Sequence, residues 1–162
     1  MHKFEGEYGE NDCNVKLKGG EPYFLINLEK YCYSNNFGGS SPHCDFIYVI
    51  FDGDKIKIFI VELKNINDIQ RERIEGILNE AYDKFLNTKF LLYNENRKDI
   101  VNIVNFFNIR NAEHYGVLVL PESDKINALL SRFKSKFVSL KRNGFSGAWI
   151  SPCGGSIWSR LI

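Results

Sequence analysis

Three side chains of the types that bind and activate a divalent metal ion lie within one segment of the sequence: Asp45, Glu62 and Lys64. Asp45 opens an apolar run, and Glu62 and Lys64 close the β-patterned run that follows it. Side chains two residues apart on a strand share a face, so Glu62 and Lys64 are expected to point the same way. Two carboxylates and one ammonium at one end of a sheet predict a metal site with a lysine beside it.

The chemistry that such a site supports is phosphodiester hydrolysis. Mg²⁺ and Mn²⁺ prefer oxygen ligands, so the expected ligands are Asp45, Glu62 and the carbonyl group of Leu63. The ion turns a bound water into a nucleophile near neutral pH, and Lys64 would orient or deprotonate that water. The competing interpretation is a solvated cross-strand ion pair worth under about 1 kcal/mol. The position of Asp45 at the other end of the same segment favours the metal site.

The segment that carries these residues has the pattern of a β-hairpin. Residues 45–51 and 55–64 are rich in β-branched and aromatic side chains, and Asp52-Gly53 between them is typical of a tight turn. Antiparallel pairing around this turn places Asp45 within one or two residues of the level of Glu62.

Elsewhere the spacing of apolar residues predicts alternating helices and strands. Helices are expected over residues 21–33, 68–88, 99–107 and 122–140, and strands over residues 90–93 and 115–120. Residues 1–20 are expected to form a short strand or a partly ordered N-terminal arm. Residues 144–162 are expected to form a loop or hairpin within a basic and aromatic tail that starts at residue 141. This order predicts one α/β domain over residues 1–162, a sandwich with a central mixed β-sheet flanked by helices.

Basic residues are concentrated near the end of the chain. No acidic residue follows Asp124, whereas seven of the 21 basic residues do. Such a one-signed region favours a polyanionic partner, and the alternative is simple solvation of an exposed helix face. The nucleic-acid contacts predicted from this region are Lys134, Lys136, Lys141 and Arg142.

The cysteines and the hydropathy limit where the protein acts. The four cysteines are scattered without a Cys-x-x-Cys pair, which argues against a zinc ribbon and predicts buried free thiols rather than a disulfide. No apolar stretch reaches the roughly 18 residues of a membrane helix, and the first residues lack the apolar core of a secretory signal. We therefore expect a cytoplasmic protein with no membrane partner.

The arrangement of Pro42, Asp45 and the Glu62-Leu63-Lys64 triplet resembles the PD-(D/E)xK nuclease superfamily. The core of that superfamily is a helix, three strands, a helix and a strand, with the aspartate after a proline and the Glu-x-Lys at the end of the next strand. Here two residues separate Pro42 from Asp45, which departs from the pattern. The resemblance covers residues 18–93 best. It implies a restriction-endonuclease-like fold and a homodimeric, Mg²⁺- or Mn²⁺-dependent endonuclease that acts on DNA in preference to RNA.

Within the superfamily, the stretch before Asp45 is most similar to archaeal Holliday-junction resolvases, which implies selectivity for junctions or branched DNA. Those enzymes place a catalytic glutamate early in the first helix and a serine in the loop before the aspartate. Glu21 and Glu29 compete for the first role, and Glu21 is preferred because it lies on the apolar stripe of the expected helix. Ser40 or Ser41 would contact a phosphate.

The helix after the Glu-x-Lys triplet contributes one further predicted contact. Many superfamily members carry a glutamine in this helix near the active site, and Gln70 occupies a matching place; the alternative is an ordinary exposed glutamine. The rival to the nuclease as a whole is a catalytically inactive protein that keeps the fold and serves in nucleic-acid binding or assembly. Cleavage that depends on metal separates the two.

Overall fold

The centre of the molecule is a five-stranded mixed sheet with the strand order β3-β4-β5-β6-β7. The computed structural model describes residues 6–10, 13–17, 23–28, 42–65, 73–94 and 112–160. The strands of the sheet are β3 (Tyr23–Asn27), β4 (Phe46–Asp52), β5 (Lys55–Leu63), β6 (Glu113–Leu120) and β7 (Gly147–Pro152). The first three form an antiparallel meander, and β6 and β7 continue the sheet parallel to β5. The predicted α/β class and central mixed sheet are confirmed.

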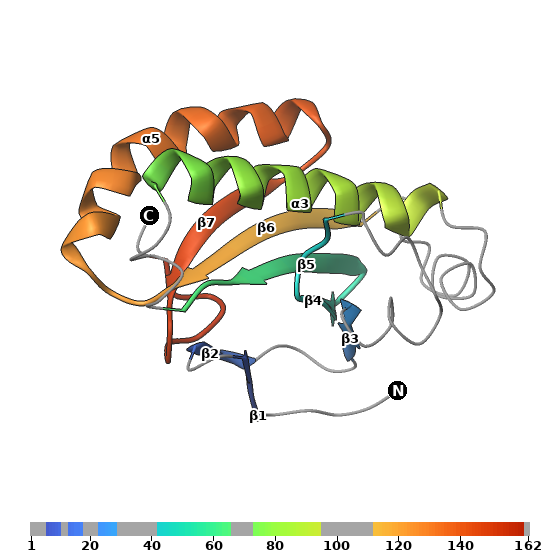
Figure 1. Cartoon of the computed structure of the whole chain (residues 1–162). Coiled ribbons are helices and arrows are strands. Elements are labelled where there is room, and N and C mark those ends of the chain that lie inside the picture. The colour runs from blue at the N-terminus through green and yellow to red at the C-terminus, as the bar shows by residue number, and fades with distance from the viewer. Residues whose placement is uncertain are drawn as a thin grey trace.

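Different elements cover the two faces of the sheet (Figure 1). Helices α3 (Ile74–Asn94) and α5 (Asp124–Arg142) lie on one face and enclose the larger apolar core. The hairpin of β1 (Gly6–Glu10) and β2 (Cys13–Leu17) lies on the other face, where it joins a second apolar cluster. With apolar layers on both sides, the central strands are buried on both faces, and their apolar runs are nearly continuous.

The hairpin that carries Asp45, Glu62 and Lys64 is confirmed. Strands β4 and β5 pair from Phe46 with Val61 to Asp52 with Lys55. Gly53 in the turn has φ of 62°, a backbone conformation that glycine adopts without steric cost. Strand β6 and helix α5 also match their predicted positions, at residues 115–120 and 122–140.

The helix predicted over residues 21–33 is wrong at Tyr23–Asn27, which form strand β3. Tyr23, Phe24, Leu25 and Ile26 follow one another without a polar residue, so the pattern does not distinguish a helix from a strand. The run is continuous because both faces of this strand meet an apolar layer. Ile26 packs against the core under the helices, and Leu25 packs against the cluster on the other face. Short apolar runs of this kind are ambiguous by periodicity alone. Because Tyr23–Asn27 form a strand, no helical stripe over these residues favours Glu21 over Glu29.

Two further predicted elements are also corrected. Residues 90–93 do not form a strand, because helix α3 continues to Asn94 and turns Leu92 into the same core as Ala81 and Phe85. Residues 147–152 of the tail form strand β7 inside the main sheet rather than a loop or a separate hairpin. In both places the apolar run is short, and its tertiary contacts decide its conformation.

Cys13 and Cys153 form a disulfide, so the prediction of free thiols is wrong for this pair. It joins β2 to the turn that follows β7, across a sequence separation of 140 residues. Spacing along the sequence cannot reveal a bridge between such distant positions. Cys44 is a buried free thiol, as predicted.

Some predictions fall outside the residues that the structure describes. These are the helix over residues 99–107, the helix start at Asp68, and Cys32. Among the described residues, neither α3 nor α5 combines the length and the apolar character of a membrane-spanning helix.

Candidate metal centre and nucleic-acid interface

The structure places Asp45 and Glu62 side by side where β4 begins and β5 ends. Because Phe46 pairs with Val61, the register carries Asp45 to the level of Glu62. The backbone N–H of Asp45 donates to the carbonyl of Val61 at 3.0 Å. The Asp45 carboxylate accepts a hydrogen bond from the backbone N–H of Leu63, with 2.6 Å between N and Oδ2. These contacts fix the aspartate against the strand end that carries the Glu-x-Lys triplet.

Glu62 and Lys64 point together toward helix α3, as the strand alternation predicts. Glu62 is 1% exposed and Lys64 is 5% exposed. The intervening Leu63 belongs to the apolar cluster on the other face of the sheet. A solvated surface ion pair would leave both charged groups in water, so burial rules out the competing interpretation of a solvated pair.

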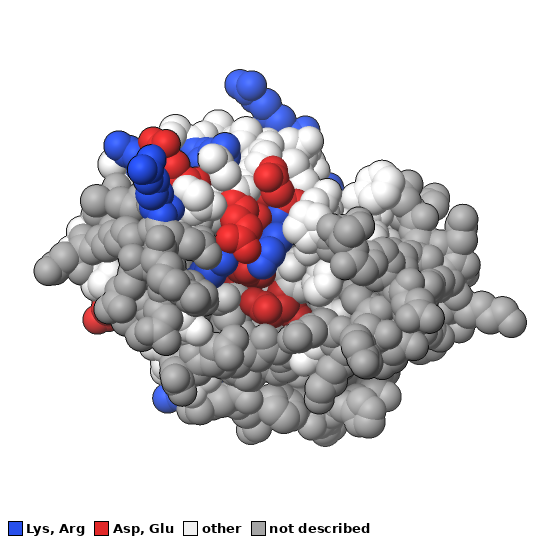
Figure 2. Space-filling model, in the orientation of Figure 1, with Lys and Arg blue, Asp and Glu red and all other residues white. Residues whose placement is uncertain are grey.

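Two residues of helix α3 that the sequence analysis missed complete the charged cluster. Nζ of Lys84 lies 2.5 Å from Oε1 of Glu62 and 3.0 Å from Oε1 of Glu80. Nζ of Lys64 lies 2.8 Å from Oε2 of Glu80. We call these five residues, Asp45, Glu62, Lys64, Glu80 and Lys84, the charged cluster. Figure 2 shows acidic and basic side chains gathered in the middle of one face, over α3 and the sheet beneath it.

The position of Glu80 and Lys84 follows from the helical repeat. At about 100° per residue they lie within about 40° of each other, beside the apolar stripe of Ile77, Ala81 and Phe85. A Glu and a Lys four residues apart usually form a solvated helix pair, which is why the sequence gave no reason to single them out. Their place at the border of the buried stripe is the signal that could have found them.

Burial makes the charges of the cluster depend on one another. The pKa of Glu62 is raised to about 8, first by burial and then by the Asp45 carboxylate, although Lys84 and Lys64 lower it. Burial lowers the pKa of the Lys84 ammonium, but Glu62 and Glu80 outweigh this effect and hold the pKa above its ordinary range. The pKa of Lys64 is also raised, because Glu80 outweighs the effect of burial. Two carboxylates that repel each other in a buried site favour an added cation.

The surroundings of one Glu62 oxygen favour a divalent ion at Asp45 and Glu62. Oε2 of Glu62 is buried and has no hydrogen-bond partner among the described residues, whereas Oε1 is paired with Lys84. A buried unpaired carboxylate oxygen is costly, and a hard cation is a partner that would satisfy it. Within the described part of the chain, no group of three His, Cys, Asp or Glu side chains is arranged to hold a metal ion. The two acidic side chains of the predicted site, Asp45 and Glu62, would need the Leu63 carbonyl and water molecules to complete the coordination of an ion.

The predicted basic contacts lie on helix α5, which packs beside α3. Lys134, Lys141 and Arg142 are exposed, and Lys136 is half-buried with its ammonium 5.2 Å from the centre of the Tyr82 ring. Figure 2 shows basic side chains on the same face of the molecule as the charged cluster.

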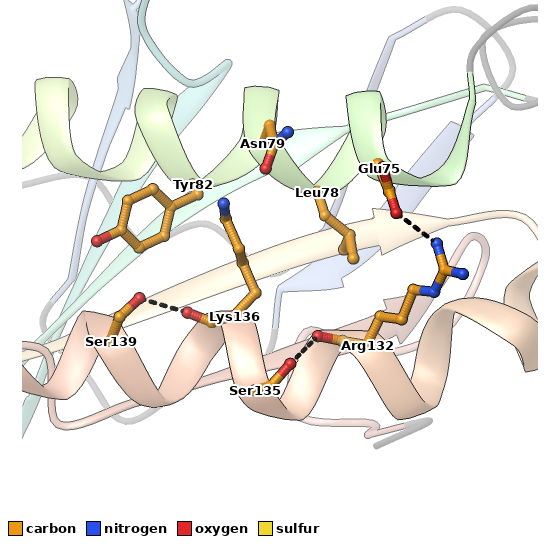
Figure 3. A pocket seen from close by; sticks show the side chains of 8 residues that line it. All are labelled: Glu75, Leu78, Asn79, Tyr82, Arg132, Ser135, Lys136 and Ser139. Atoms are coloured by element: carbon orange, nitrogen blue, oxygen red, sulfur yellow. Dashed lines mark hydrogen bonds and ion pairs between the residues drawn. The ribbon is translucent and has the colours of Figure 1, made fainter.

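A groove of about 510 Å³ separates α3 from α5 (Figure 3). Its lining combines polar and apolar surface and consists of Glu75, Leu78, Asn79, Tyr82, Arg132, Ser135, Lys136 and Ser139. Arg132 crosses it at one end and contacts Glu75, with 2.7 Å between Nη1 and Oε1. Tyr82 and Glu75 lie on the flank of α3 opposite Glu80 and Lys84, so the groove and the charged cluster are separate features.

The remaining predicted site residues, Glu21, Ser40, Ser41 and Gln70, lie outside the described residues, as does Glu29. Comparison of the chain with protein-family models, with curated proteins and with solved structures found no match.

Proposed function

We propose that the chain is a metal-dependent nuclease of the PD-(D/E)xK type that hydrolyses phosphodiester bonds in DNA. The observation that carries the proposal is the burial of Glu62 and Lys64 beside Asp45, with Oε2 of Glu62 lacking a partner in the part of the chain that the structure describes. Strands β3, β4 and β5, helix α3 and strand β6 also follow the order of three strands, helix and strand that the resemblance implies. The helix expected before them is not found at Tyr23–Asn27.

Each residue has a distinct part in the proposed reaction. Asp45 and Glu62 would hold Mg²⁺ or Mn²⁺, which supplies a nucleophilic water and stabilises negative charge on the phosphate. Lys64 is buried and held by Glu80, so its ammonium is fixed in place to orient a water or to contact a phosphate oxygen. The N–H of Leu63 holds the Asp45 carboxylate in place.

Helix α5 would bind the phosphate backbone, through Lys134, Lys141 and Arg142 on its exposed surface. Phosphate contacts release counterions, so binding weakens as salt rises. Replacing Lys134 or Lys141 with Gln should lower the slope of log affinity against log salt by about 1 each, whatever the DNA sequence. Slopes equal to that of the unchanged protein would remove α5 from the interface.

The test of activity is cleavage of labelled duplex, single-stranded and four-way-junction DNA with Mg²⁺ or Mn²⁺, and with EDTA as the metal-free control. We expect cutting that requires metal and is lost in Glu62→Gln and Asp45→Asn. Asp83→Asn is the matched control, because Asp83 is an exposed acid on α3 next to Lys84. Preference for the junction would support the resolvase-like substrate class.

A non-catalytic nucleic-acid-binding protein is the second candidate. It is favoured by the ion pairs that α3 already provides to both Glu62 and Lys64, which give each charge a structural partner. In that case the protein would bind DNA and leave it uncut with either metal. The same substrates separate the two candidates in a binding assay run beside the cleavage assay.

The homodimer and the cytoplasmic location belong to the same proposal. Light scattering of the purified protein gives the mass that decides between monomer and dimer. The Cys13–Cys153 disulfide fits a cytoplasm only if that compartment permits protein disulfides, as in hyperthermophiles.

A further inference from the structure

The ammonium of Lys84 lies beside Glu62, where a bound metal would contribute its positive charge. Nζ of Lys84 is 2.5 Å from Oε1 of Glu62, and the glutamate side chain is only 2% exposed. A charge pair at this distance inside a protein is strong, because little water screens it. A metal ion that binds Glu62 therefore has to compete with an ion pair that the protein already contains.

Glu80 gives Lys84 a second acidic partner nearer to solvent. Its Oε1 atom is 3.0 Å from Nζ of Lys84, and its side chain is 37% exposed. Lys84 and Glu80 are one helical turn apart on α3, and the lysine carries its charge on a flexible four-carbon chain. Lys84 can therefore move away from Glu62 and keep a carboxylate partner.

We infer that Lys84 is an internal cation that competes with the divalent metal for Glu62, and that Glu80 holds Lys84 when the metal is bound. This inference rests on the proposed function, since it requires a metal at Asp45 and Glu62. Lys84 would then be a positioning residue that sets the metal affinity of the site. Its removal should strengthen metal binding, whereas removal of a residue that only supports the fold would weaken it.

The formal charge of the cluster favours replacement of the Lys84 ammonium by a divalent ion at Glu62. When all five groups are ionised, three carboxylates and two ammonium groups give a formal charge of −1. A divalent ion beside Glu62 would repel an ammonium that stayed 2.5 Å from the same carboxylate. Movement of Lys84 toward the half-buried Glu80 relieves this repulsion. It leaves Oε1 of Glu62 available together with Oε2, which has no partner among the described residues.

The experiment is a calorimetric titration of the whole protein with Mn²⁺ near neutral pH, without nucleic acid. Lys84→Met should bind Mn²⁺ at least about tenfold more tightly than the unchanged protein, since close buried charge pairs have coupling energies of that size or larger. Lys84→Arg restores a cation and should return the affinity toward the original value. Lys134→Met removes an exposed lysine of α5 and is the matched control, with no change expected.

Glu80→Gln tests the second half of the inference and does not depend on whether Lys84→Met folds. Without Glu80, Lys84 keeps only Glu62 of its two acidic partners in the cluster, so Mn²⁺ binding should weaken several-fold. Asp83→Asn removes the same charge from the same helix at an exposed position and should leave the affinity unchanged. Circular dichroism of each variant verifies that it is folded.

The outcomes distinguish this inference from the function on which it rests. Tighter binding in Lys84→Met, lost again when Glu62→Gln is added, supports the exchange. Equal or weaker binding in folded Lys84→Met overturns it but leaves the metal centre in place, and equal or tighter binding in Glu80→Gln does the same. If no variant binds Mn²⁺, including Lys84→Met, the metal centre fails, and both the proposed function and this inference fail with it.

Discussion

The buried imidazole of His114 predicts that the protein loses stability in mild acid. His114 lies in β6, is 3% exposed, and is hydrogen-bonded through Nε2 to the hydroxyl of Tyr93. Its pKa is lowered from 6.5 to about 4, first by burial and then by the nearby Lys89, although a hydrogen bond with the Ala112 backbone raises it. The folded state therefore takes up this proton less readily than the unfolded state does.

The size and sign of the effect follow from that difference. Above pH 6.5 the imidazole is neutral in both states, and its contribution to stability is fully present. As the pH falls from 6.5 toward 4, the unfolded chain binds the proton first, and stability is lost. At about 1.4 kcal/mol per pKa unit, the free energy of unfolding should fall by about 3 kcal/mol over this range.

Urea unfolding at several pH values measures this loss. Carboxylates also titrate in this range, so the quantity to compare is the difference in unfolding free energy between the unchanged protein and His114→Gln. Gln keeps an acceptor for the Tyr93 hydroxyl and has no group that titrates here. The difference should shift by about 3 kcal/mol in favour of the variant between pH 7 and pH 4. A difference that stays constant over that range would refute the reasoning.

Three further predictions concern stability. Cys13→Ser removes a disulfide that spans 140 residues and should lower the free energy of unfolding in urea by about 5 kcal/mol. A reducing agent should produce the same loss in the unchanged protein and no further loss in the variant. Gly116→Ala would bring a Cβ atom within 3.1 Å of the Phe85 ring and should lower the free energy of unfolding by about 1–3 kcal/mol. Gly76 on α3 has open space around it, so Gly76→Ala should raise the free energy of unfolding by about 0.5–1 kcal/mol. Equal effects of the two substitutions would contradict the packing argument. Thr88→Val removes the hydroxyl that accepts the buried N–H of Cys44 at 2.9 Å and should cost about 1–3 kcal/mol, and an unchanged unfolding midpoint would count against it.

The hairpin could be predicted because its information is local. Asp52-Gly53 fixes the turn, and the alternation of Lys55 and Lys57 with apolar residues fixes the register of β5. These two features place Asp45 within one or two residues of the level of Glu62, and the observed register puts the two residues opposite each other. The part of the candidate site that lies on this hairpin was therefore predictable.

The helical half of the charged cluster was not predictable in this way. Glu80 and Lys84 have the spacing of a solvated helix pair, and only the packing of α3 on the sheet turns them toward Glu62. Strand β3 escaped prediction because apolar layers on both faces removed its alternation. The Cys13–Cys153 bridge depends on the N-terminal hairpin lying against the turn after β7, which no local pattern encodes.

Stability alone does not explain the charged cluster. Buried ion pairs contribute little net stability, because desolvation of the charges offsets their attraction, and apolar residues of similar size often serve as well or better. Here the attraction does not fully offset the desolvation, since Oε2 of Glu62 has no partner within the described ranges and the pKa of the carboxyl is raised to about 8. This incompletely paired charge lies at the end of the β4–β5 hairpin, beside Glu80, an acid that solvent reaches. A site for a cation that arrives from solvent accounts for all three features at once, whereas a structural ion pair accounts only for the contact between Glu62 and Lys84.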